Sequence, residues 1–166
     1  MTHEELAAHT EIQQVLFRYC RGVDRGDKTM LASVYHPDAI DRHGAWEGPG
    51  RAFGDYLVPA MDAANLSSQH HITNSLIDLD GARARVESYF IALHPLRDEA
   101  GARHAFVCGR YLDRFELRDG AWKIAERQVV IDISRALDAA VPWPGAAAFP
   151  SGARREADPS WALFKG

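Results

Sequence analysis

Apolar residues near the start of the chain recur with the period of an α-helix. Between residues 12 and 23 they form one stripe, with polar residues on the other sides. Thr2 followed by Glu5 is a capping-box pattern, which predicts that the helix begins directly after Thr2. Gly26 suits the left-handed conformation that ends many helices. The pattern therefore predicts one helix between Thr2 and Gly26.

Two further helical segments are predicted before residue 67. Asp27 can cap a short helix that runs to Tyr35, since the proline at position 37 disfavours helical geometry before it. Residues 39–46 indicate a strand edge and a loop. A second helical stripe covers residues 53–64, and Pro59 inside it predicts a kink or an early break.

From Ser67 the apolar pattern changes to the alternation of β-strands. Asp-Gly pairs at 80–81 and 119–120 are typical of tight hairpin turns, and residues 97–101 predict a longer polar loop. Strands joined by turns without intervening helices pair antiparallel, so helices followed by such a meander predict an α+β fold. The four predicted strands cover residues 67–79, 82–94, 103–118 and 121–134.

The predicted strands also indicate what covers the sheet. In residues 82–94, alternate positions on one face are apolar, and the other face becomes apolar toward the end of the strand. The helices can cover one face, and a second subunit is the natural cover for the other, so we expect an oligomer. In the last strand the apolar parity switches, which predicts a bulge near residues 125–127.

The sequence beyond residue 135 differs in composition from the helical and strand segments before it. Residues 136–166 are rich in proline and alanine, which predicts irregular structure. A disordered tail seldom carries several large aromatic residues, yet this one contains Trp143, Phe149, Trp161 and Phe164. We therefore expect the tail to lie on the domain of residues 1–135 or on a neighbouring subunit.

Composition argues against several classes of protein. The 166 residues are 46% hydrophobic and 25% charged, an ordinary balance for one globular domain. The formal net charge of −4 gives no electrostatic reason to expect a nucleic-acid partner. No apolar run reaches the length of a membrane span, and the polar N-terminus does not resemble a secretory signal. Cys20 and Cys108 lie in apolar segments, so we expect free thiols and a cytoplasmic location.

Asp24 is the first residue with catalytic potential. It lies at the inner edge of the apolar stripe, near the end of the first helix, where the helix dipole disfavours a carboxylate. A solvated carboxylate, or an ion pair with Arg21 or Arg25, explains its position at least as well as a role in a site. Spacing alone leaves both interpretations open.

The adjacent histidines His70 and His71 supply the second candidate. Neighbouring residues of a strand point to opposite faces, and His70 shares parity with Ile72, which makes it the inward member. A hydrogen-bonded structural histidine explains His70 equally well. With a buried carboxylate that orients the ring and stabilises the imidazolium, however, a histidine can abstract a proton near neutral pH. Such chemistry requires no cofactor.

Other catalytic classes have less support. The chain contains neither the Gly-x-Ser-x-Gly elbow of a serine hydrolase nor a His-Glu-x-x-His zinc motif. His70 and His71 point to opposite faces and cannot easily bind one ion. No glycine-rich phosphate loop is present. We therefore expect neither a metal nor a cofactor.

Four stretches, in this order and spacing, resemble the SnoaL-like branch of the NTF2-like superfamily. The resemblance covers residues 5–135 and implies a cone-shaped, strongly curved sheet wrapped around the N-terminal helices. It also implies a deep pocket between them and assembly into a homodimer or homotrimer. The stretches are IQQVLFRYCRGVDRGD at 12–27, QHHITN at 69–74, GRYLDRFE at 109–116 and DGAWKIAERQVVID at 119–132.

The resemblance also implies roles for single residues. In scytalone dehydratase, bile-acid 7α-dehydratase and lindane dehydrochlorinase, an aspartate of the first helix and a strand histidine form the catalytic dyad. Those positions match Asp24 and His70. A tyrosine that matches Tyr19 polarises a substrate oxygen in the bile-acid dehydratase. The further acid or histidine on the middle strands of some relatives has no direct match, but His94 and His104 lie nearby.

Three classes of function follow as hypotheses. The leading one is a cofactor-independent lyase or dehydratase acting on a small cyclic or aromatic molecule, with His70 as the base, Asp24 orienting it and Tyr19 donating a hydrogen bond. The second is an isomerase or polyketide-cyclase reaction with the same dyad. The third is a non-catalytic binding module or auxiliary subunit, as in the small subunit of aromatic-ring dioxygenases. The residues expected to bind the substrate are Asn74, Phe90, His94, Tyr111 and Arg127.

Overall fold

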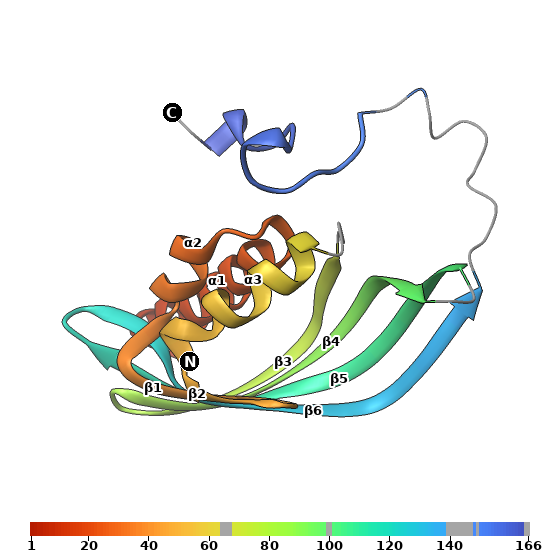
Figure 1. The fold of residues 1–166 in the computed structure, drawn as a ribbon. Coiled ribbons are helices and arrows are strands. Elements are labelled where there is room, and N and C mark those ends of the chain that lie inside the picture. Colours follow the sequence, from red (N-terminus) through yellow and green to blue (C-terminus); the bar gives the residue numbers. More distant parts are fainter. Residues whose placement is uncertain (64–67, 99–100, 139–147, 149, 165–166) are drawn as a thin grey trace.

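Helices form one layer on the concave side of a curved sheet (Figure 1). The computed structural model describes residues 1–63, 68–98, 101–138, 148 and 150–164. In this part of the chain the α-helices are α1 (His3–Arg25), α2 (Lys28–Ser33) and α3 (Phe53–Ala63), and none of them is long and apolar enough to cross a bilayer. Thr2 and Glu5 exchange hydrogen bonds as a capping box, and Gly26, with a φ of 65°, ends α1. Both predicted ends of α1 are confirmed.

The two shorter helices differ from the prediction in detail. Asp27 caps α2 as expected, but α2 ends at Ser33 because Tyr35 already pairs as a strand residue. Pro59 does not break α3, which continues to Ala63. A proline removes the hydrogen bond to the carbonyl four residues earlier, here that of Asp55. Both residues are exposed, so water can solvate this carbonyl and the helix tolerates the loss.

The sheet contains six strands in the order β2-β1-β6-β5-β4-β3. The four strands predicted from alternation are present and pair antiparallel with their chain neighbours. The first strand, in contrast, pairs parallel with the last, so the sheet is mixed, while the α+β class and the curved fold are as predicted. The strands are β1 (Tyr35–His43), β2 (Trp46–Pro49), β3 (Gln69–Asp80), β4 (Arg83–Asp98), β5 (Gly101–Arg118) and β6 (Ala121–Asp138).

Bulges in β6 decide which of its side chains face the helices. The pairing with β5 skips Ala125, as the parity switch predicted, and this shift turns Arg127 inward. A second shift at Asp132 turns Ile133 to the outer face, opposite Cys108, which simple alternation does not predict. The inner face of β6 therefore carries a buried cation in the middle of an apolar layer.

That cation, Arg127, is paired inside the core. Its guanidinium donates hydrogen bonds of 2.7 and 2.6 Å to the two carboxylate oxygens of Asp113 on β5, and both side chains are fully buried. The guanidinium carbon also lies 4.1 Å from the ring centroids of Tyr19 and Tyr111. Ion pairing and cation–π contacts together join α1 to the centre of the sheet.

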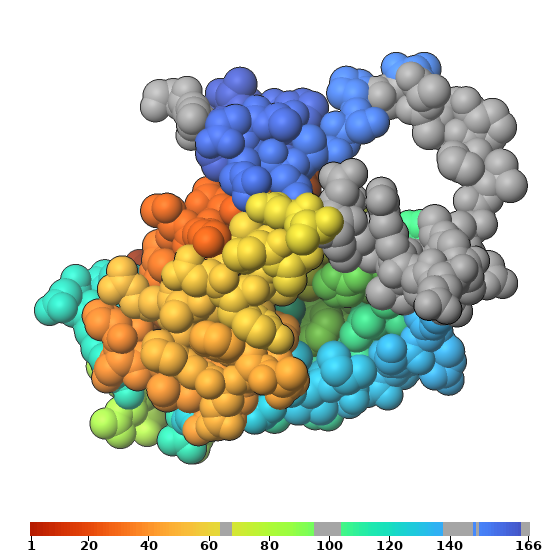
Figure 2. Space-filling view, in the orientation of Figure 1, coloured from red at the N-terminus to blue at the C-terminus, as the bar shows by residue number. Residues whose placement is uncertain are grey.

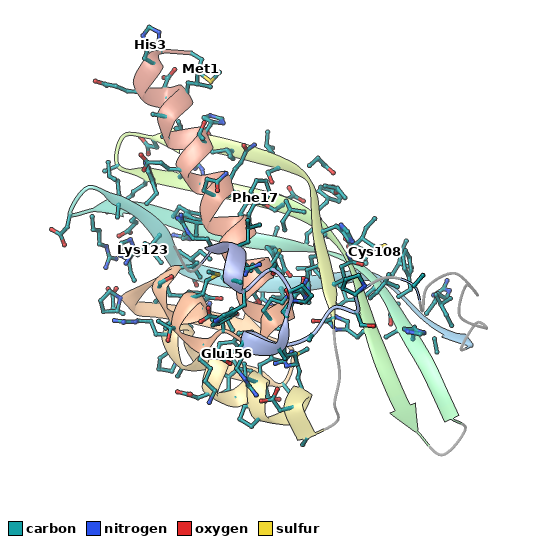
Figure 3. All side chains as sticks on the ribbon, turned by 90° about the horizontal axis from the view of Figure 1, so that it is seen from above. Met1, His3, Phe17, Cys108, Lys123 and Glu156 are labelled. Atoms are coloured by element: carbon teal, nitrogen blue, oxygen red, sulfur yellow. The ribbon has the colours of Figure 1, made fainter. Side chains whose placement is uncertain are left out.

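The C-terminal segment 150–164 lies on the side of the helices that faces away from the sheet (Figure 1). Figure 3, which looks down on the helices, shows α1 crossing the strands and the part of this segment around Glu156 lying over the helical layer. Ion pairs attach the segment to the domain: Arg154 to Asp62 at 2.8 Å, and Asp158 to Arg25 at 3.2 Å. Of the tail aromatics, Trp143 and Phe149 lie outside the described residues.

The convex face of the sheet carries an apolar patch that no described segment of the chain covers. In two neighbouring rows of the β4–β5–β6 ladder, aliphatic and aromatic side chains share this outer face with Arg110, which lies between Tyr89 and Val130 and is ion-paired to Glu87 and Asp132. Tyr89 is 44% exposed and Ile133 is 48% exposed. The patch is consistent with the expected second subunit, and the oligomer stays a prediction. Its residues are Tyr89, Ile91, Cys108, Val130 and Ile133.

Candidate active site

Asp24 and His70 are directly hydrogen bonded. The Nδ1 atom of His70 lies 2.6 Å from Oδ1 of Asp24, and the backbone N–H of His70 donates to Oδ2 at 3.0 Å. Ser68 adds a third hydrogen bond, from its Oγ to Oδ1, at 2.9 Å. The Asp24 side chain is 11% exposed and that of His70 is 8% exposed. The Asp24 carboxylate is therefore held by Ser68 and His70 and is not solvated at the helix end, while Arg25 donates to the backbone carbonyl of Asp24 at 3.5 Å.

The contact with Asp24 sets the tautomer of a neutral His70 ring. A carboxylate is an acceptor, so Nδ1 of His70 carries the proton that points to Asp24. Nε2 of a neutral ring is then the unprotonated nitrogen, which can accept a proton. His71 is exposed, as expected for the neighbour that points to the other face. The geometry assigns the inward position to His70.

A bulge in β3 turns one of the predicted substrate contacts away from the cavity. The pairing with β4 shifts between Ile72 and Ser75, so the residues before and after the shift face inward with opposite parity. Asn74 falls inside the shift, is exposed, and accepts a hydrogen bond from Thr73 at 3.0 Å. It does not lie at the site.

His70 lines a cavity of about 310 Å³ between the helices and the sheet. The surface is hollowed between α3 and the strands β4 to β6 (Figure 2). Larger hollows of about 410, 470 and 630 Å³ lie elsewhere on the described surface, and charged residues line most of the first two and a smaller part of the third. The walls of the His70 cavity, in contrast, are mainly apolar and aromatic. They are formed by Tyr19, Val23, His43, Gly44, Leu57, Met61, His70, Phe90, His94, Val107, Tyr111, Val129 and Ile131.

Three predicted site residues form the aromatic part of this wall. The rings of Phe90 and Tyr111 stack with centroids 4.5 Å apart, and Tyr111 meets Tyr19 edge-on at 5.5 Å. Gly109 lies opposite Phe90 in the β4–β5 pairing, and a Cβ at this position would collide with the Phe90 ring and with the backbone of Val130. The glycine is thus required for the wall to pack. Burial keeps the pKa of Tyr19 well above its usual range, so its hydroxyl stays protonated and can donate.

His94 lies beside His70 in the same cavity. The two rings are edge-to-face with centroids 4.9 Å apart. Burial, and secondarily repulsion from His70, lower the pKa of His94 to about 4. His94 is therefore uncharged at neutral pH, and it offers the cavity one donor or acceptor without a charge.

Arg127, predicted to contact the substrate, does not line the cavity. Its side chain is fully buried behind Tyr19 and Tyr111 and is bound to Asp113. The bulge at Ala125 explains this inward position, but the prediction did not include the neighbouring carboxylate that holds the guanidinium. Arg127 supports the aromatic wall from behind.

Two polar residues of the site were missed by the sequence prediction. Ser68 is buried and donates to Asp24, and its place directly before the QHHITN stretch is the only signal of this role in the sequence. His43 ends β1 and lines the cavity, with Nδ1 3.5 Å from the Tyr19 hydroxyl. Its position depends on the pairing of β1 with β6, which local pattern does not reveal.

The described residues contain no group of three or more His, Cys, Asp or Glu side chains placed to hold a metal ion. What they do contain is a histidine base held by a buried carboxylate, inside an apolar cavity with several uncharged donors. This arrangement can abstract a proton from a bound molecule and stabilise the resulting charge. The fold and the site thus define an α+β domain with an acid–base cavity between its helices and its sheet.

The chain belongs to the SnoaL-like domain family. The model of that family matches residues 4–128, which is most of the chain. This match agrees with the resemblance carried by the four sequence stretches and includes Asp24, His70 and all the other lining residues up to Tyr111. A search of curated proteins gave no match.

Solved structures share the fold at low sequence identity. Hexachlorocyclohexane dehydrochlorinase LinA type 2 is 21% identical, with 85% of this chain and 97% of that chain covered and a TM-score of 0.73. A candidate scytalone dehydratase from Novosphingobium aromaticivorans is 23% identical, with 85% and 93% covered and a TM-score of 0.66. Rv3472, a protein of unknown function from Mycobacterium tuberculosis, is 27% identical, with 76% and 77% covered and a TM-score of 0.63. These similarities establish the curved α+β fold.

Proposed function

We propose that this protein is a cofactor-independent lyase that removes water or another small leaving group from a cyclic or aromatic molecule. The observation that carries the proposal is the 2.6 Å contact between Nδ1 of His70 and Oδ1 of Asp24. It leaves Nε2 of His70 as the base for a substrate in the cavity. Asp24 orients the ring and stabilises the imidazolium that forms after proton transfer.

The walls of the cavity define the substrate class. A volume of about 310 Å³ accommodates a molecule of one or two fused rings. Tyr19, Phe90 and Tyr111 present aromatic surfaces that favour a flat or apolar molecule. No carboxylate and no Lys or Arg is among the described lining residues, so a charged substrate would lack a counter-ion. The hydroxyl of Tyr19 can donate a hydrogen bond to a substrate oxygen.

The reactions named for two structural relatives are eliminations, which supports the proposal. The dehydrochlorinase removes hydrogen chloride and a dehydratase removes water, as their names state. An elimination of either kind can begin when a base removes a proton from carbon. An isomerase begins with the same step but returns the proton to another carbon, so His70 and Asp24 suit both. The open cavity argues against a purely structural subunit, because aromatic side chains do not fill it.

Turnover of defined probes tests the proposal. 3-Hydroxy-1-tetralone loses water to give fluorescent 1-naphthol, and 3-chloro-1-tetralone gives the same product with release of chloride. We expect protein treated with EDTA to convert at least one of them faster than buffer, with saturation, and His70→Gln to abolish the conversion. Hexachlorocyclohexane, with chloride release as the readout, extends the panel.

Two other results separate the alternatives. Conversion of 3-cyclohexenone to 2-cyclohexenone, without turnover of the tetralones, would indicate an isomerase. If tetralones bind, as shown by a calorimetric titration, but none of the probes is converted, the protein is a binding module. Either result would overturn the lyase proposal.

A further inference from the structure

We propose that His43 is a second catalytic residue, the acid that protonates an oxygen leaving group on the side of the cavity opposite the base. The inference rests on the proposed elimination and assigns the base and the acid to different residues. His70 takes a proton from carbon, and His43 gives a proton to oxygen. The sequence prediction did not include His43 in the site.

The topology places the two histidines on opposite walls. His43 ends β1 and His70 lies at the start of β3, and in the sheet order these strands are separated by β6, β5 and β4. β1 and β3 thus lie toward opposite edges of a sheet whose concave side holds the helices (Figure 1). Both histidines line the same cavity. A molecule in this cavity can contact both imidazoles, one from each part of the sheet.

Three contacts hold the His43 ring. It stacks on Phe53 with centroids 4.5 Å apart and planes inclined by 20°. Its Nδ1 atom lies 3.5 Å from the Tyr19 hydroxyl and 3.8 Å from Oδ1 of Asp41. The Nδ1 edge is thus turned toward Tyr19 and Asp41, and the Nε2 edge remains for a molecule in the cavity. The side chain is 30% exposed, so solvent can restore its proton.

Asp41 provides a buried carboxylate that can stabilise the protonated imidazole of His43. Its side chain is fully buried, and Tyr35 donates a hydrogen bond of 2.7 Å to Oδ2. Oδ1 is buried without a hydrogen-bond donor among the described residues. Arg127 lies opposite Asp41 in the β1–β6 pairing, but the hydrogen bonds of its guanidinium go to Asp113. A small rotation of His43 brings its Nδ1–H onto Oδ1, which satisfies the carboxylate and stabilises the imidazolium.

The other polar groups of the wall are less suited to be the acid. Tyr19 is buried with a raised pKa, so its hydroxyl donates a hydrogen bond without releasing its proton. His94 has a pKa of about 4 and carries no extra proton at neutral pH. His94 also lies against His70, on the base side of the cavity. His43 is the histidine that has its own buried carboxylate away from Asp24.

Atoms and electrons balance in the proposed elimination. Nε2 of His70 accepts the proton from the carbon next to the carbonyl, and the C–H electron pair becomes the new C=C bond. The C–O bond breaks with its electron pair on oxygen, and Nε2 of the His43 imidazolium gives that oxygen a proton, which yields water. The proton gained by His70 and the proton lost by His43 are then exchanged with solvent. No oxidant or reductant takes part.

The test compares two leaving groups in one ring system. Hydroxide requires protonation to leave, whereas chloride does not. We expect His43→Gln to lower kcat/KM for 3-hydroxy-1-tetralone by about 100- to 1,000-fold and for 3-chloro-1-tetralone by less than about 5-fold, after subtraction of the spontaneous rates. His70→Gln should lower both. His71→Gln, a change of an exposed histidine on the outer face, is the matched control and should change neither.

Each outcome is decisive. If His43→Gln lowers both rates equally, or neither, while wild type eliminates both groups, the inference is wrong and the proposed function stands. If wild type converts neither probe, the proposed function fails and the inference fails with it. Circular dichroism and thermal unfolding show whether His43→Gln folds.

A second measurement needs no variant. For wild type acting on 3-methoxy- and 3-(fluoroalkoxy)-1-tetralones, an acid at the leaving oxygen predicts rates that depend little on the pKa of the departing alcohol. A steep dependence would contradict the role of His43.

Discussion

The carboxylate of Asp24 binds both the ring and the backbone of His70. Nδ1 lies 2.6 Å from Oδ1 and the backbone N–H lies 3.0 Å from Oδ2. The same carboxylate therefore fixes the direction of the imidazole and the position of the strand that carries it. A pair held in this way is preorganised, so little reorganisation is needed when His70 takes a proton.

Replacing Asp24 with asparagine should impair catalysis without unfolding the protein. An amide can present its N–H group to Nδ1 and favour the wrong tautomer, as expected when a carboxylate that orients a histidine is lost. We expect Asp24→Asn to lower kcat for 3-hydroxy-1-tetralone by about 100- to 10,000-fold with a smaller effect on KM. Glu11→Gln, on the exposed side of the same helix, is the control. Similar kinetics for both variants would argue against the orienting role.

His94 predicts a pH dependence of stability. Its folded-state pKa of about 4 lies below the ordinary value of 6.5, so the unfolded chain binds more protons between these values. The stability that it contributes is complete above pH 6.5 and is lost as the pH falls toward 4, by at most about 3 kcal/mol. Urea unfolding of wild type and His94→Gln at a series of pH values measures this contribution. The variant should show the shallower decline between these two pH values, and parallel curves would contradict the assignment.

The buried pair of Arg127 and Asp113 predicts a large effect on folding. Asp113→Asn leaves a buried guanidinium without its counter-charge, which should lower the free energy of unfolding by about 3–5 kcal/mol. Asp78→Asn is the matched control, because Asp78 pairs with Arg85 on the exposed surface, where a single ion pair contributes little. Denaturant unfolding of both variants gives the comparison. Equal losses would mean that burial does not control the strength of these pairs.

The outer apolar patch predicts self-association. Patches of this kind on a sheet face are buried in oligomers, and we expect wild type to sediment as a homodimer or homotrimer. Ile133→Asp places a charge in the patch and should shift the protein to monomer at micromolar concentration. Leu76→Asp is the control, on an exposed leucine of β3 outside the patch. A monomeric wild type would contradict this prediction.

Local signals predicted the three helices and the four long strands, but not β2 or the full extent of β1. Thr2, Glu5 and Gly26 fixed the ends of α1 because capping depends on residues within one turn. Asp-Gly turns and alternation identified the four long strands, and alternation also separated His70 from His71. These features depend on neighbours in the chain, which a single sequence displays.

Features that depend on distant partners could not be predicted. The parallel pairing of β1 with β6 joins segments far apart in the chain, such as Asp41 and Arg127, and it is this pairing that brings His43 to the cavity. The β3 bulge that turns Asn74 outward is not marked by glycine or proline. Arg127 was identified, but its partner Asp113 is defined only by the register of two strands. The register between strands that are distant in the chain therefore determines most of the site contacts that the sequence did not predict.

Comparison of two neighbouring histidines tests the central claim most directly. The claim is that His70, oriented by Asp24, is the general base. Elimination from 3-chloro-1-tetralone, which needs no acid, should fall by at least about 100-fold in His70→Gln and remain at the wild-type level in His71→Gln. If His70→Gln folds and retains the wild-type kcat/KM, His70 is not the base and the account of this site is wrong.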